Sequence, residues 1–192
     1  MVSYRIESGI VRIFWAEEMV YEIKEAFIPC LSHLQQVSSK EELLLRLEEC
    51  EDRAGKKLLI SMLARRGLFY KQAEKKLAEQ GLSLLAQGRI LTWAMERGLL
   101  CDDEMIDTAV RGEFRRGKGL FALQKKIAPW HHIQVTRELQ QQEEEALFAL
   151  LHKKTIDPQS LSLLEKQKLY RVLQRKGFSV ATIQKVLFLL EE

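Results

Sequence analysis

The spacing of hydrophobic positions changes near residue 38. Before it, residues 4–28 carry β-branched and aromatic side chains in short runs, broken at Ser8-Gly9 and again at Ala16-Glu17-Glu18. Such runs are typical of two or three short strands. Because so few strands are only marginally stable alone, we expect a small N-terminal β-hairpin that packs on helices.

From residue 39 onward, apolar residues recur at the three- and four-residue spacing of amphipathic helices. Ser38 or Ser39 can cap the first helix, and acidic side chains follow where the helix dipole favours them. Glycine and proline mark most of the breaks between helices. The predicted helices span residues 39–50, 53–66, 69–80, 84–97, 102–116, 119–128, 131–152, 160–176 and 179–190.

A helix, a break and a second helix recur three times along the chain. The first copy breaks at Gly81 and the last at Gly177, whereas the middle copy has Pro129 and His131 near its break. The copies are about 45 to 50 residues apart, a period typical of stacked helical repeats that form a curved binding scaffold. We therefore divide the chain into a β-rich extension (1–38), a linker helix with the first repeat (39–101), a second repeat (102–147) and a third repeat (148–192).

Composition agrees with a helical protein and indicates its compartment. The chain has three prolines and ten glycines in 192 residues, and no apolar run is long enough to predict a transmembrane helix or a signal peptide. Cys30, Cys50 and Cys101 are odd in number and scattered, which suits a reducing compartment rather than a disulfide framework. We expect a cytoplasmic monomer without membrane contact.

Charge is divided unevenly along the chain. Residues 1–52 carry five Lys/Arg and eleven Asp/Glu, a net charge of −6, whereas residues 53–192 carry a net charge of +9. This asymmetry indicates a basic binding surface, and ordinary variation among solvated faces is the alternative. Several cations share a helix face, among them Arg111, Arg115 and Lys118. The candidate residues for contact with a filament or DNA are Arg65, Arg66, Lys71, Lys75, Lys76, Arg111, Arg115, Arg116, Lys118, Lys125, Lys126, Lys168, Arg171, Arg175 and Lys176.

Residue patterns that could support catalysis or metal binding all have simpler interpretations. Cys30 and His33 lack a second ligand pair for a tetrahedral metal site, and adjacent His131 and His132 point in different directions on a helix. The acidic run that starts at Asp102 suits a helix N-terminus. Residues 117–119 lack the spacing of a phosphate-binding loop. We expect no catalytic residue, metal or cofactor.

Taken together, these residues resemble the RecX family of bacterial recombination regulators. The similarity covers most of the chain and includes Gly98-Leu99-Leu100, Asp102-Asp103 and Lys118-Gly119. Its most specific part is the stretch from Leu173 to Ser179. Ile13-Phe14-Trp15 before Glu17-Glu18 also resembles a short β extension found in part of that family. The middle repeat departs from the family pattern, with Lys126-Ile127 in place of an acidic residue and leucine and with His131 in place of a common glycine.

The resemblance implies an elongated crescent of three tandem three-helix repeats that binds the RecA recombinase filament. It implies a non-enzymatic modulator of the RecA ATPase and strand exchange in homologous recombination, DNA repair and the SOS response, with inhibition as the expected direction and single- or double-stranded DNA as a further partner. Two alternatives remain open. One is a sequence-reading DNA-binding regulator, because helix-turn-helix units also join two helices by a short turn; the other is a helical adaptor that binds a different protein.

Overall fold

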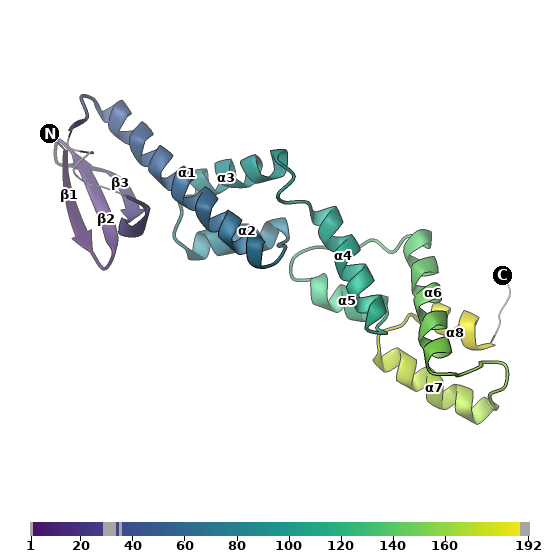
Figure 1. The fold of residues 1–192 in the computed structure, drawn as a ribbon. Coiled ribbons are helices and arrows are strands. Elements are labelled where there is room, and N and C mark those ends of the chain that lie inside the picture. Colours follow the sequence, from purple (N-terminus) through teal and green to yellow (C-terminus); the bar gives the residue numbers. More distant parts are fainter. Residues whose placement is uncertain (1, 29–33, 35, 189–192) are drawn as a thin grey trace. The chain divides into compact units, whose positions relative to one another are not determined.

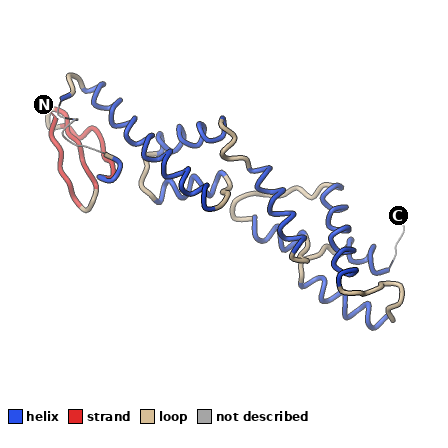
Figure 2. The backbone as a smooth tube through the Cα atoms, viewed as in Figure 1, coloured by secondary structure: helices blue, strands red, loops and turns tan. Residues whose placement is uncertain are grey.

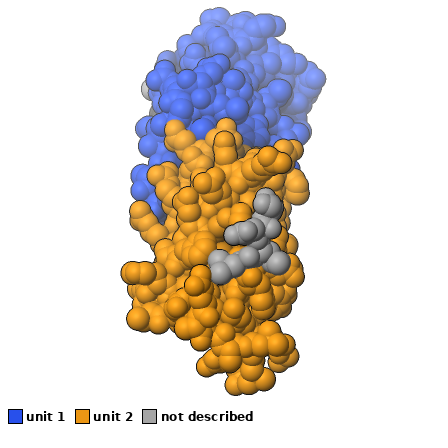
Figure 3. Space-filling view, turned by 90° about the vertical axis from the view of Figure 1, so that its right-hand side faces the viewer, with its two compact units in different colours: residues 1–101 blue, residues 102–192 orange. Residues whose placement is uncertain are grey.

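A computed structural model describes residues 2–28, 34 and 36–188 of the chain (Figure 1). The chain divides into two compact units, residues 1–101 and residues 102–192 (Figure 3). The described strands all belong to the first unit, and helices make up most of the rest (Figure 2). The prediction of a mainly helical fold with a small β-rich N-terminal segment is confirmed.

The N-terminal segment is a three-stranded antiparallel sheet, one strand more than a single hairpin. Its strands are β1 (Val2–Glu7), β2 (Ile10–Trp15) and β3 (Glu18–Lys24), in the order β1-β2-β3. Both connections are two-residue turns with positive φ, at Ser8-Gly9 and at Ala16-Glu17, which matches the twist of paired strands. A short 3-10 helix, Glu25–Phe27, follows.

The sheet is stable because one of its faces packs on the first long helix, α1 (Lys40–Arg65). The Ser39 hydroxyl caps this helix by accepting a hydrogen bond from the backbone nitrogen of Glu42 at 3.1 Å. Burial of apolar side chains from both elements removes them from water. The buried residues of this cluster are Val11, Ile13, Ile23, Ile28, Leu34, Leu43 and Leu47.

Helix α1 is continuous, so the predicted break at residues 51–52 is wrong. Glu51 is buried within the helix and accepts hydrogen bonds from the Tyr21 hydroxyl at 2.7 Å and from the backbone nitrogen and hydroxyl of Ser83. Asp52 pairs with Arg89, whose Nη2 lies 2.9 Å from Oδ1. These tertiary contacts hold two acidic residues in a helix where the sequence shows only a polar interruption.

The first three-helix group consists of α1, α2 (Tyr70–Glu79) and α3 (Leu84–Glu96). Gly81, with φ +79, ends α2 in a conformation that favours glycine. The core between these helices contains Leu59, Leu68, Ala73, Leu77, Leu82, Ala86, Ile90, Leu91, Ala94 and Leu100.

The second unit contains α4 (Asp102–Arg115), α5 (Leu120–Ile127), α6 (Arg137–Lys153), α7 (Leu163–Arg175) and α8 (Val180–Phe188). Helix α4 packs on α5, and α6 and α7 pack on α8. The last group has its own core of Leu147, Leu151, Leu173, Phe178, Ile183, Val186 and Leu187.

A helix over residues 131–136 was predicted and is wrong. These residues follow Pro129 without helical structure, and α6 begins only at Arg137. The Thr136 hydroxyl accepts a hydrogen bond from the backbone nitrogen of Leu139 at 3.2 Å and so caps the start of α6. His131 lies in this non-helical segment, with its Nδ1 3.4 Å from Oδ2 of Asp102.

The buried carboxylate of Glu143 on α6 joins elements of the second unit through hydrogen bonds, as Glu51 does in the first unit. Glu143 Oε1 accepts hydrogen bonds from the backbone nitrogens of Leu120 at 2.7 Å and Ser179 at 3.1 Å. Its Oε2 accepts one from the Thr182 hydroxyl at 2.8 Å. One side chain thus satisfies donors at the starts of both α5 and α8, which otherwise have no helical acceptor.

Glycines at residues 119 and 177 allow two chain segments to approach closely. The backbone nitrogen of Gly119 donates to the carbonyl of Lys176 at 3.0 Å, and that of Phe121 donates to the carbonyl of Gly177 at 2.8 Å. A Cβ at Gly119 would meet the backbone of Phe178. The glycines near Lys118 therefore serve packing, in agreement with the absence of a phosphate-loop pattern.

Candidate binding surface

Three of the predicted cationic residues converge on one buried carboxylate in the second unit. Glu113 lies on α4, and its side chain is only 3% exposed. Arg116 pairs with its Oε1, Lys126 Nζ lies 2.7 Å from the same oxygen, and Lys118 Nζ lies 3.7 Å from Oε2. One negative charge on α4 therefore holds three positive charges, two from the loop that follows α4 and one from α5.

The protonation of Glu113 follows from this arrangement. Burial alone would raise the pKa of Glu113, because it disfavours the charged form. The hydrogen bond from Lys126 and the charges of Lys126, Arg116 and Lys118 outweigh burial, so that the pKa lies below its ordinary value of 4.5. Glu113 is thus charged at neutral pH, and the group keeps a net charge of +2.

We call this group the Glu113 cluster (Glu113, Arg116, Lys118 and Lys126); its contact with an anion stays a prediction. Its three cations are each more than half exposed although their charged ends meet the buried carboxylate. Fixing long side chains beforehand lowers the entropy lost on binding. Arginine and lysine in such positions recognise phosphates and carboxylates.

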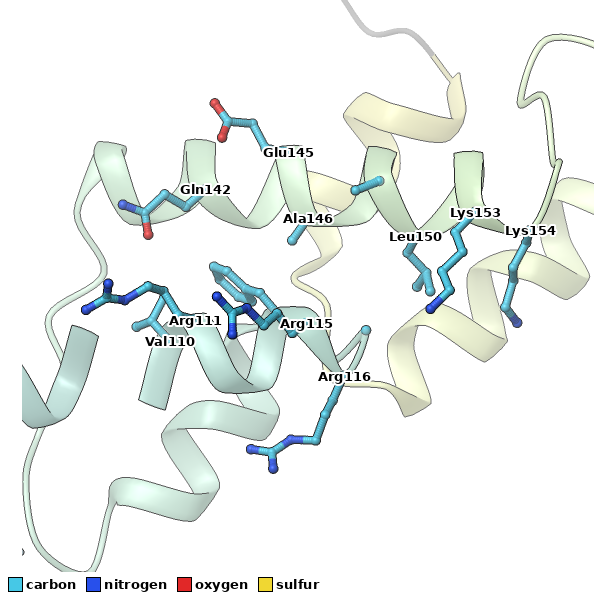
Figure 4. A pocket seen from close by; sticks show the side chains of 13 residues that line it. Val110, Arg111, Arg115, Arg116, Gln142, Glu145, Ala146, Leu150, Lys153 and Lys154 are labelled. Carbon is cyan, nitrogen blue, oxygen red and sulfur yellow. The ribbon is translucent and has the colours of Figure 1, made fainter. Parts of the chain in front are cut away.

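Arg111 and Arg115, also predicted, line a groove between α4 and α6 (Figure 4). The groove has a volume of about 770 Å³. Its apolar lining comes from Val110, Phe114, Ala146, Ala149 and Leu150. Lys153 and Lys154 complete the basic lining at the end of α6.

Sequence reasoning did not select Lys153 and Lys154. They stand at the end of a helix, where cations are commonly explained by the helix dipole. The groove also depends on α4 and α6 being neighbours, and the sequence spacing of Phe114 and Leu150 does not reveal this. The available signal was that Lys153-Lys154 form a second pair of adjacent cations, 38 residues after Arg115-Arg116.

The other predicted cations are spread over separate helices. In the first unit, Arg65, Arg66, Lys71 and Lys75 are exposed and Lys76 is half-buried, and Lys75 lies 4.0 Å from Glu79. In the second unit, the exposed members on α5 and α7 are Lys125, Lys168, Arg171 and Arg175, with half-buried Lys176 after α7. Contact of these residues with a filament or DNA stays a prediction.

Metal and membrane contacts find no support in the part of the chain that the structure describes. No group of three or more His, Cys, Asp or Glu residues there can hold a metal ion. Cys30 and His33 lie outside the described residues. Within the described ranges, no helix is long and apolar enough to cross a membrane.

Comparison with known proteins gives one family. Residues 141–187, which include most of α6, α7 and α8, match the RecX third three-helix domain. The crystal structure of RecX from Lactobacillus salivarius is similar at a TM-score of 0.59 and 17% identity, covering 73% of this chain and 98% of that one. Residues 141–187 thus match a RecX domain, and the chain has a RecX-like fold.

A second RecX structure agrees over the full length. The crystal structure of regulatory protein RecX has a TM-score of 0.55 and 14% identity, and the match covers 98% of this chain and 97% of that one. No curated protein sequence matches the chain. Glu143 and Ser179 both lie within the matched RecX domain.

Proposed function

We propose that this protein is a member of the RecX family that regulates homologous recombination by binding the RecA nucleoprotein filament and inhibiting its ATPase and strand exchange. The match of residues 141–187 to the RecX third domain carries the proposal. The protein acts as a cytoplasmic binding module without a catalytic step or cofactor of its own, in DNA repair and the SOS response.

The Glu113 cluster and the neighbouring arginines supply the physical means of contact. A nucleoprotein filament presents DNA phosphates and acidic protein side chains, and both are bound by fixed cations. Arg111 and Arg115 are exposed on the same helix as Glu113. The Glu113 cluster, Arg111 and Arg115 therefore place five cations within α4, α5 and the loop between them.

The test is the single-stranded-DNA-dependent ATPase of RecA, titrated with this protein at two salt concentrations. The test variant replaces Arg111, Arg115 and Lys118 with alanine, which leaves Arg116 and Lys126 to neutralise Glu113. If these three residues each contact one phosphate, binding by the unaltered protein should weaken by an additional ~18-fold between 50 and 200 mM salt relative to the variant. A control variant replaces exposed Arg53, Lys57 and Arg137, which gives the same change in net charge.

The two variants separate specific contact from general charge. We expect the Arg111/Arg115/Lys118 variant to inhibit RecA at least tenfold less effectively and to depend less on salt, while the control variant inhibits as the unaltered protein does. Equal inhibition by both variants would rule out this surface. A lack of any effect of the unaltered protein on RecA at saturation would reject the RecA proposal.

A further inference from the structure

We propose that the groove between α4 and α6 binds an acidic amphipathic helix of a partner protein. The groove lies wholly within the second unit (Figure 4). Arg111 and Arg115 line this groove and are also among the proposed phosphate contacts. The groove proposal goes beyond those contacts because its apolar lining offers a surface that neither phosphates nor a uniformly charged segment can use.

The apolar lining has the spacing that a docked helix requires. Val110 and Phe114 are four residues apart on α4, and Ala146 and Leu150 are four residues apart on α6, so each pair lies on one helix face. Phe114 and Leu150 are half-buried, which leaves apolar surface for a partner to cover. Apolar grooves between two helices commonly bind an amphipathic helix that has apolar residues at i, i+3/i+4 and i+7.

Small residues keep the groove open. Ala146 and Ala149 leave space along α6 that larger side chains would fill, and Ala149 is exposed. At the end of α4, Gly117 has φ +67, and a Cβ there would lie 2.9 Å from Cδ1 of Leu150. A volume of about 770 Å³ falls within the range of ligand-binding clefts and so leaves room for several partner side chains.

Charge around the groove determines the chemistry of the partner. Arg111 and Arg115 stand on the α4 side, and Lys153 and Lys154 stand at the end of α6. Glu145 is the one acidic residue of the lining, and Figure 4 shows its carboxylate directed away from α4. Complementary charge raises the association rate and selects against basic partners. The fitting partner is thus a helix with acidic side chains beside an apolar row.

A nucleic acid strand would satisfy only part of this surface. Its phosphates would pair with Arg111, Arg115 and the two lysines, but the aliphatic lining of Val110, Ala146 and Leu150 provides no hydrogen bonds for the strand. An acidic amphipathic helix covers the apolar lining and pairs with the cations at once, so it gains both the burial and the charge contributions.

The test uses a displayed library of 14-residue helical peptides that share a leucine row, with the other positions drawn from glutamate, lysine and serine. Selection on the full-length protein should enrich glutamate beside the leucine row. The best peptide, labelled with fluorescein, is then measured by fluorescence anisotropy. Ala149→Trp fills the groove from an exposed position and should weaken binding at least tenfold, whereas Ala78→Trp, on an exposed position of α2, should leave binding unchanged.

A second variant tests the charge requirement. Lys153→Gln with Lys154→Gln should weaken the same peptide at least threefold, while Arg53→Gln with Lys57→Gln should not change its affinity. Enrichment of no peptide, enrichment of lysine-rich peptides, or equal binding to the Ala149→Trp protein would each overturn the proposal. Displacement of the peptide by a single-stranded oligonucleotide whose own binding is unchanged by Ala149→Trp would also overturn it and assign the cations to phosphate. Because peptide binding is measured without RecA, its failure is distinguishable from failure of the RecA proposal.

Discussion

Removing the buried carboxylate of Glu143 should destabilise the second unit more than any single substitution on its surface. Glu143 is fully buried and accepts three hydrogen bonds, from Leu120, Ser179 and Thr182. In Glu143→Ala, all three donors lose their acceptor. The donors of Leu120 and Thr182 belong to buried residues that water reaches poorly, whereas Ser179 is half-buried and can be partly rehydrated.

The expected magnitude follows from these three donors. A buried donor left without a partner costs about 1 to 3 kcal/mol, and bonds to charged acceptors are at the upper end. Two such donors plus a partly hydrated third give a loss of about 3 to 5 kcal/mol, a large share of the 5 to 15 kcal/mol that is typical for a whole domain. Glu143→Gln keeps one oxygen acceptor for the two backbone donors, so we expect it to cost about 1 to 2 kcal/mol.

Urea unfolding followed by circular dichroism measures the loss, and amide hydrogen exchange locates it. Exchange should speed up at Leu120 and Ser179, the two amides that Glu143 holds. The matched control is Glu144→Ala, which removes the neighbouring carboxylate and its ion pair with Lys185 at 3.2 Å. This pair is partly exposed to water, and surface pairs contribute about 0 to 1 kcal/mol. If Glu143→Ala and Glu144→Ala destabilise equally and exchange is unchanged, the argument from buried donors is refuted.

Three further predictions concern other parts of the fold. Glu113→Gln should destabilise the protein at pH 7. The loss of stability should shrink as pH falls through the lowered pKa of Glu113, because the stabilisation by the native carboxylate is present above 4.5 and is lost on protonation. Thermal melting at pH 7 and pH 3 measures it, and an equal loss of stability at both pH values would contradict the ion-pair account. Gly119→Ala should lower the free energy of unfolding by about 1 to 3 kcal/mol, because the added Cβ meets the backbone of Phe178. In the same urea titration, Gly88→Ala should stabilise α3 by about 0.5 to 1 kcal/mol, since a Cβ at residue 88 has nothing within 4 Å. Glu17→Gly should stabilise the sheet by up to about 1 kcal/mol because residue 17 has φ +71, and an unchanged or lower melting temperature would contradict this.

Local pattern determined most of the elements of this protein. The strands on either side of Ser8-Gly9 and Ala16-Glu17 and most of the helices after residue 39 follow from alternation, helical periodicity and turn residues, because these signals depend on neighbours a few positions away. The same reasoning selected Arg116, Lys118 and Lys126 as binding candidates from their charge. The resemblance to the RecX family came from short motifs over most of the chain, the most specific around Gly177, and residues 141–187 match a RecX domain.

Tertiary contacts decided where those elements begin, end and meet. Glu51 keeps α1 continuous through hydrogen bonds to Tyr21 and Ser83, residues about 30 positions away in the chain, and Pro129 with Thr136 delays the start of α6. Three cations converge on Glu113 only because folding brings their side chains together. The same holds for the groove between α4 and α6, which Lys153 lines. Sequence periodicity reports which face of a helix is apolar, but the partner of that face is set by packing over the whole unit.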